Sequence, residues 1–201
     1  LYDATIHARE VITPLSLLHF INFLLNGYGT DPIATYLVNN RELWFILVLN
    51  PDGYRINEML RPGGGGMWRK NARDNNLNGA FDTDYDGVDL NRNFNAHWGD
   101  STGASPNPAS PTYFGPAPFS EPESRGFKDF VLSHNFRTHI NFHSFGNLYL
   151  FPWGYTRSLC SDHDYFMLYT SWMVERNLYI NGNSSATIYI TTGDMVDWMY
   201  D

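Results

Sequence analysis

LWFILVL, residues 43–49, is an almost uninterrupted apolar run, and the turn-forming residues Asn50-Pro51-Asp52-Gly53 follow it at once. A short apolar run bounded by turn residues is typical of a strand that is buried on both faces. We therefore expect a buried strand at Leu43–Leu49 and a turn at residues 50–53.

Strand and helix signals alternate on the N-terminal side of this run. Leu1–Ile6 reads as a strand, and Pro14 fits the first turn of a helix that runs to about Leu25 and ends at Gly27 and Gly29. Asp31-Pro32 combines a capping residue with a first-turn proline, which predicts a second helix ending near Asn39-Asn40.

The C-terminal side begins with residues 61–118, which are rich in Gly, Asn, Asp, Ser and Pro and predict long loops. Beyond them the pattern predicts helices at Glu121–His134 and Asp164–Leu178, and strands at Arg137–His143, Leu148–Phe151 and Ile188–Ile190. Strands alternating with helices indicate an α/β fold with helices on both faces of a sheet.

Composition limits the class of protein. A length of 201 residues favours one domain, and 43% hydrophobic residues are enough for a sizeable core. The formal net charge of -8, without a basic run, makes nucleic acid an unexpected partner. No segment approaches the ~20 apolar residues of a membrane span. Cys160 is the sole cysteine, so it forms neither an internal disulfide nor a thiolate metal site.

Metal-binding residue types occur at two places far apart in the chain. His7 and Glu10 are separated by two residues and can turn toward one ion, and His143 supplies a distant third ligand. Three protein ligands leave a fourth position of a tetrahedral zinc open for water or substrate, as in a catalytic site. His139, in the same predicted strand as His143, is interpreted as structural.

Further motifs follow in order: Trp68-Arg69-Lys70-Asn71, then GVDLNRNF at residues 87–94, then IYITTGDMVDW at residues 188–198. Together with the metal motif, the chain resembles the zinc metallocarboxypeptidases from residue 1 to residue 201. The last segment looks similar to the bacterial carboxypeptidase T branch. The resemblance implies a mixed, mostly parallel twisted sheet and one Zn²⁺ ion.

The resemblance implies a role for each motif residue. His7, Glu10 and His143 match the zinc ligands, and Asp89 matches the carboxylate that holds the first histidine from behind. Arg69 matches the arginine that stabilises the oxyanion, a task suited to a fixed guanidinium. A loop-capping role for Asp89 and a surface position for Arg69 are the structural alternatives.

Substrate-binding roles follow in the same way. Asn91 and Arg92 match the pair that binds the terminal carboxylate, for which the planar fork of arginine is suited. Tyr189 matches the tyrosine that closes over substrate, with a packed strand aromatic as the alternative. The positions lining the subsites before the cleaved bond are Arg9, Ser144 and Phe145, and the family often has Tyr where Phe145 stands.

Two residues of the last motif bear on specificity. Val196 matches a pocket position that is apolar in enzymes selecting apolar or aromatic termini. Asp194 matches an acidic pocket residue of the carboxypeptidase T branch and could pair with a terminal Lys or Arg. The resulting hypothesis is mixed specificity for apolar, aromatic and basic C-terminal residues.

The stretch Asp82-Thr83-Asp84-Tyr85-Asp86-Gly87 is similar to the start of a calcium loop, although Asn93 stands where the closing glutamate would be. A solvated turn is the alternative interpretation. Asp74 could add a further ligand.

The family's general base is a glutamate shortly beyond an Asp-Trp-x-Tyr segment, which Asp197-Trp198-Met199-Tyr200 matches here. The sequence reaches Asp201 before that glutamate. We therefore expect a truncated catalytic domain over residues 1–201, lacking an N-terminal portion and the base, and inactive by itself. The parent protein is expected to be a secreted, monomeric enzyme that hydrolyses C-terminal peptide bonds. Two alternatives stay open: an inert relative that binds peptide C-termini, and a zinc amidase acting on cell-wall peptides or side-chain amides.

Overall fold

The computed structural model describes all 201 residues, which form two compact units. Unit 1 comprises residues 1–71 and 130–144, and unit 2 comprises residues 72–129 and 145–201. Each unit contains its own small parallel sheet.

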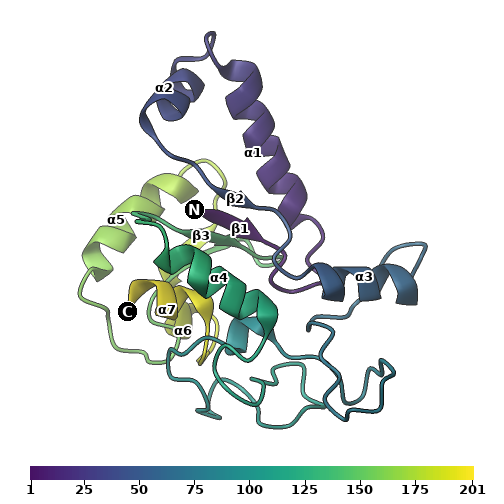
Figure 1. The fold of residues 1–201 in the computed structure, drawn as a ribbon. Coiled ribbons are helices and arrows are strands. Elements are labelled where there is room, and N and C mark those ends of the chain that lie inside the picture. Colours follow the sequence, from purple (N-terminus) through teal and green to yellow (C-terminus); the bar gives the residue numbers. More distant parts are fainter. The chain divides into compact units, whose positions relative to one another are not determined.

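The sheet of unit 1 has the strand order β2-β1-β3, with β1 at Tyr2–Ala4, β2 at Phe45–Ile46 and β3 at Ile140–Phe142 (Figure 1). Both pairings are parallel, and Asp3 of β1 lies opposite Ile46 on one side and Asn141 on the other. Because all three strands are parallel, the segments that follow them emerge at the same end of the sheet.

Three helices complete unit 1: α1 at Thr13–Gly27, α2 at Pro32–Asn40 and α3 at Pro51–Leu60 (Figure 1). Each has proline in its first turn, where the missing N–H costs nothing. The Asp31 carboxylate caps α2 by accepting from the Ile33 and Ala34 amides. The expectations for α1 and α2 are confirmed to within two residues at each end.

Two expectations around residues 43–53 are wrong. The strand shrinks to Phe45–Ile46 at the edge of its sheet, and its residues are half-buried. Asn50-Pro51-Asp52-Gly53 begins a helix instead of a turn, because the Asn50 Oδ1 accepts from the Gly53 amide at 3.0 Å. Asparagine before proline is a signal for both turns and helix starts, and here the helix forms.

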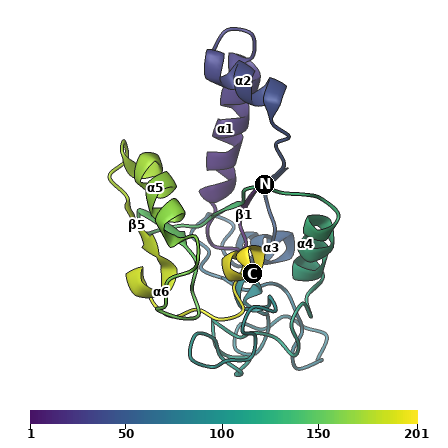
Figure 2. The ribbon, with the colours of Figure 1, turned by 90° about the vertical axis from the view of Figure 1, so that its left-hand side faces the viewer.

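Unit 2 begins with long irregular loops, as expected, broken by a 3₁₀ turn at Leu90–Arg92. Helix α4, Pro122–Leu132, lies within the expected range and ends in unit 1. The two-stranded sheet pairs β4 at Leu148–Phe151 with β5 at Ile180–Asn183. Helices α5 at His163–Val174 and α6 at Ser184–Thr187 contact this sheet (Figure 2), and α7 spans Met195–Tyr200.

The sequence patterns were least informative at this end of the chain. The strand expected at Ile188–Ile190 is wrong, since these residues follow α6 as irregular backbone. Strand β5 and helices α6 and α7 were not expected. Helix α5 ends at Val174, and it buries little of its apolar surface, with Trp172 61% exposed.

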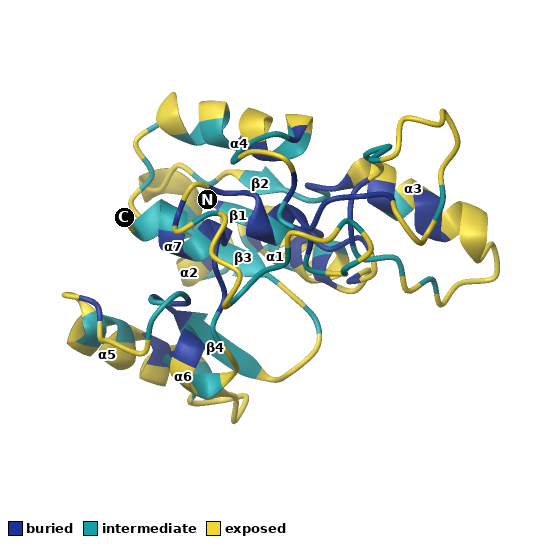
Figure 3. Cartoon of the chain, turned by 90° about the horizontal axis from the view of Figure 1, so that it is seen from below, coloured by how far each residue is buried: buried dark blue, intermediate teal, exposed yellow.

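The core of each unit is small. In unit 1 it includes Ala4, Ile6 and Leu17, and in unit 2 the Phe94 ring contacts Phe119, Phe127 and Trp198. Figure 3 shows buried colouring at β1 and extensive exposed colouring on α3 and α5. None of the helices combines the length and apolar character that a membrane crossing requires. Parallel strands combined with helices confirm the expected α/β class.

The start of α3 depends on a glycine. A Cβ added to Gly53 would lie 2.4 Å from the Lys70 carbonyl oxygen and 2.8 Å from the Ala8 Cβ, and neither can move freely. We predict that Gly53→Ala lowers the free energy of unfolding by about 2 kcal/mol or more, as overpacking does. Gly63→Ala is the control, since nothing lies within 4 Å there, and it should change stability little. Equal effects of the two changes in urea denaturation would contradict this account.

Candidate metal centre

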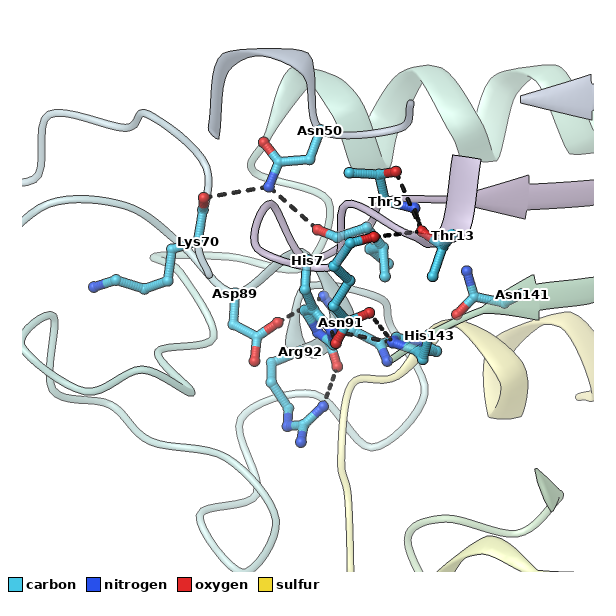
Figure 4. A network of polar contacts seen from close by, with 12 residues as sticks. Thr5, His7, Thr13, Asn50, Lys70, Asp89, Asn91, Arg92, Asn141 and His143 are labelled. Carbon is cyan, nitrogen blue, oxygen red and sulfur yellow. Dashed lines mark hydrogen bonds and ion pairs between the residues drawn. The ribbon is translucent and has the colours of Figure 1, made fainter. Parts of the chain in front are cut away.

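Three side chains of unit 1 converge on one point. His7 and Glu10 lie in the turn between β1 and α1, and His143 directly follows β3. Glu10 Oε1 lies 2.9 Å from His7 Nδ1, and Glu10 Oε2 lies 2.9 Å from His143 Nδ1. The two Nδ1 atoms are 3.1 Å apart, and Figure 4 shows the two histidine side chains close together. Residues 136 positions apart in sequence thus form one cluster.

The donor set fits zinc. Two imidazole nitrogens and a carboxylate are typical ligands, and such atoms lie about 3.3 Å apart around a tetrahedral zinc. The observed separations of 2.9–3.1 Å are close to this value. Side-chain exposure is 35% for His143 but 4% for His7 and 6% for Glu10, so the cluster is closed on one side and open on the other. An open side is what a catalytic site needs for water or substrate.

Glu10 is held in its ionised form, which is suited to bind a cation. Burial opposes ionisation of its carboxyl, but hydrogen bonds and charge from His143 and His7 outweigh burial and hold the pKa of Glu10 below its ordinary value. The carboxylate is therefore ionised near neutral pH, which is the form that binds metal.

The turn that presents His7 and Glu10 is fixed by two threonines. Thr5 has a φ of 58°, an unusual conformation for a β-branched residue, and it ends β1. The Thr13 hydroxyl oxygen accepts from the Thr5 amide at 3.1 Å, and the hydroxyl donates to the Glu10 carbonyl at 2.8 Å. One buried hydroxyl thus ties the start of the turn to its end.

Arg69 reaches this turn through its backbone. The Ala8 amide donates to the Arg69 carbonyl at 3.0 Å. The Asn50 side chain donates to the Lys70 carbonyl, and the Asn57 side chain bonds both the amide and the carbonyl of Trp68. The half-buried Arg69 therefore starts from a backbone fixed beside the metal-binding turn.

The remaining expected residues of unit 1 flank the cluster in sequence. Arg9 lies within the turn and is exposed, and Ser144 directly follows His143 and is half-buried. Phe145 belongs to unit 2, where its side chain is fully exposed.

Asn91 and Arg92 lie in the 3₁₀ turn of unit 2, and Asp89 directly precedes it (Figure 4). Asp89 is fully buried and caps this turn through the Asn91 amide, and its expected role toward His7 stays a prediction. The Asn91 Oδ1 accepts from the Met195 amide at 2.9 Å, which leaves the amide nitrogen as the end of Asn91 suited to meet a carboxylate. Arg92 is buried and donates to the Gly103 and Asn91 carbonyls.

The segment expected to form the specificity pocket is organised by buried carboxylates. Asp194 caps α7 through the Asp197 amide at 2.8 Å and accepts from the Thr191 hydroxyl at 2.6 Å. Burial raises the pKa of Asp194, against the effect of these bonds and of Arg92. Val196 is half-buried within α7, whereas Tyr189 is 56% exposed on irregular backbone.

Asp197 is a residue that motif matching missed. It accepts from the Gly154 and Tyr155 amides and so ties α7 to the segment after β4. Burial and the neighbouring Asp194 raise the pKa of Asp197 to about 7. A second acid three residues after Asp194 is the only sequence signal for this arrangement.

The carboxylates of the acidic stretch at residues 82–87 accept hydrogen bonds from backbone amides of the same loop. Asp86 accepts from the Asn75 and Asp82 amides, and Asp82 accepts from the Asp84 and Tyr85 amides. Asp74 accepts from the Asn78 and Gly79 amides. These carboxylates hold the loop backbone in shape.

Thr13 gives a direct test of the turn. Thr13→Val removes the hydroxyl, so the buried Thr5 amide loses its partner and the Glu10 carbonyl keeps only its bond from the Thr13 amide. We therefore predict a loss of about 1–3 kcal/mol in the free energy of unfolding. Thr13→Ser keeps the hydroxyl and should lose only the contribution of one methyl group, about 0.8 kcal/mol. Urea denaturation of both variants measures the difference, and a valine variant as stable as the serine variant would contradict the proposed tie.

Comparison with known proteins agrees with this geometry. Carboxypeptidase A2 of Mus musculus is 35% identical across 99% of the chain and 47% of its own length. The crystal structure of thrombin activatable fibrinolysis inhibitor matches with a TM-score of 0.86 and 33% identity, over 100% of this chain and 50% of that one. A murein-tripeptide amidase of Escherichia coli O157, with a TM-score of 0.54 and 20% identity, shares the fold alone.

The chain spans about half the length of the curated relatives it matches. The family model described as zinc carboxypeptidase matches residues 1–201, which is the whole of the sequence. With this match and the two-histidine, one-glutamate cluster in place, the chain belongs to the zinc carboxypeptidase family.

Proposed function

We propose that the protein containing these residues is a zinc-dependent carboxypeptidase that removes single residues from peptide C-termini. The convergence of His7, Glu10 and His143 carries this proposal, because two imidazoles and one carboxylate open to solvent on one side are the ligand set of a catalytic zinc. Family membership supports the choice of metal.

The three ligands would hold the zinc ion, which supplies a Lewis acid and lowers the pKa of a bound water toward about 7. Arg69 would stabilise negative charge on the oxygen of the cleaved carbonyl, aided by its fixed backbone beside Ala8. Asp89 would orient His7 by accepting a hydrogen bond from its ring N–H.

The motif match assigns substrate binding to several further residues. Asn91 and Arg92 would bind the terminal carboxylate, and Tyr189 would close over the bound peptide. Arg9, Ser144 and Phe145 would contact the substrate residues on the N-terminal side of the cleaved bond. We propose on this basis that residues 1–201 belong to one catalytic domain.

The family's general base is a glutamate, and none of the matched motif residues corresponds to it. The one glutamate among them, Glu10, is engaged by both histidines. We therefore propose that the 201-residue chain alone binds zinc but hydrolyses peptides slowly, about 10²–10⁴-fold below the whole protein.

Specificity is proposed to be mixed. Val196 favours apolar and aromatic terminal residues, and Asp194 would pair with a terminal Lys or Arg. The cap on α7 fixes the position of Asp194, and a bound cationic side chain would favour its ionised form against the burial that raises its pKa. Four further predictions are untested: a calcium ion at residues 82–87, similarity to the carboxypeptidase T branch, a monomeric state and an extracellular location.

The activity prediction uses the whole protein and a panel of peptides with different C-termini. We expect loss of single C-terminal residues, loss of activity with a zinc chelator, and recovery with added zinc, all followed by mass spectrometry. His143→Ala should abolish turnover because one zinc ligand is removed.

Intact peptides from folded, zinc-loaded protein would contradict this function and favour an inert binder of C-termini. Cleavage confined to cell-wall peptides or side-chain amides would instead favour an amidase.

Asp194→Asn tests the specificity proposal. The amide oxygen can still accept from the Asp197 amide and cap α7, so the fold should be kept while the charge is lost. We predict that kcat/KM for Lys and Arg termini falls at least tenfold relative to that for Phe and Leu termini. An unchanged ratio would leave the apolar pocket around Val196 as the basis of selection.

A further inference from the structure

Asp3 is a fully buried carboxylate at the centre of the unit 1 sheet. Its two oxygens contact two side chains of the neighbouring strand segment: Oδ2 meets His139 Nε2, and Oδ1 accepts from Asn141 Nδ2. A buried carboxylate is costly unless it is paired, so these contacts hold Asp3 in place. None of the three residues is a member of the metal cluster.

The strand geometry connects this contact to the metal centre. Side chains alternate between the faces of a strand, so His139, Asn141 and His143 share one face. Asp3 lies opposite Asn141 in the parallel register, on that same face. The carboxylate of Asp3 thus bonds the two residues that precede His143 on its own face, while β1 leads from Asp3 into His7.

Backbone hydrogen bonding alone does not select this register. A parallel pair slipped by two residues keeps its bonds and its facing, yet it displaces one strand along the other by about 6.6 Å. Such a slip would separate His143 from His7 and Glu10. In the observed register Asp3 lies opposite Asn141 and contacts both Asn141 and His139, and a slip of two residues would break this pair of contacts.

We propose that Asp3 is a positioning residue for the metal centre, acting through His139 and Asn141 to fix β3 against β1 so that His143 meets His7 and Glu10. This inference rests on the proposed zinc function. It gives His139, which the sequence marks only as structural, a share in metal binding without direct contact to the ion.

The test measures the zinc dissociation constant of the whole protein by competition with a chromophoric chelator. Visible absorption of the Co²⁺-substituted protein reports the ligand geometry in parallel. We expect Asp3→Leu and His139→Phe to weaken zinc binding about tenfold or more, in the range seen when groups supporting metal ligands are lost. Both variants should also shift the Co²⁺ bands.

Two further variants separate positioning from stability. Asp3→Asn can accept from Asn141 and donate to a neutral His139, so it should keep zinc affinity within about threefold. Glu121→Gln, which removes a buried carboxylate in unit 2, should lower stability without altering zinc affinity or the Co²⁺ spectrum.

The inference is overturned if Asp3→Leu and His139→Phe lose stability in urea but keep the parent's zinc affinity and Co²⁺ spectrum. Failure of the proposed function would look different: the parent protein itself would not bind zinc, or His143→Ala would bind it equally well.

Discussion

The metal cluster depends on one constraint, the parallel register of β1 and β3. His7 and Glu10 follow one strand and His143 follows the other, so the three donors meet only because the two strands run side by side in the same direction. The two histidine Nδ1 atoms are held 3.1 Å apart, close to the spacing of two ligands on a tetrahedral zinc ion. Other contacts in unit 1 stabilise this arrangement of the three side chains.

Many of these stabilising contacts are hydrogen bonds between buried side chains and the backbone. Thr13 closes the metal-binding turn, Asn50 starts α3 while bonding the Ile6 and Lys70 carbonyls, and Asn57 holds the backbone before Arg69. Each of these polar groups is buried and satisfied, so its loss costs more than a surface hydrogen bond. A site supported in this way keeps its ligands near a binding geometry before the ion arrives.

The sequence predicted those elements whose signals are local. Proline with an Asp cap marked α2, and the His7-Glu10 spacing with a distant His143 marked the metal centre. It misjudged Asn50-Pro51, because the same residues begin turns and helices. It missed α7 because the cap at Asp194 is not accompanied by a long apolar period. Asp3 carried no signal, since an isolated acid in a strand reveals its partners only once β3 is placed beside it.

Zinc X-ray absorption spectroscopy on the purified protein would identify the ligands of the metal centre. We expect a first shell of nitrogen and oxygen at about 2.0–2.1 Å, with outer-shell scattering from two imidazole rings and no sulfur. Loss of one imidazole contribution in His143→Ala would identify that ligand. A shell containing sulfur, or one with only oxygen and no imidazole scattering, would contradict a metal centre built from His7, Glu10 and His143.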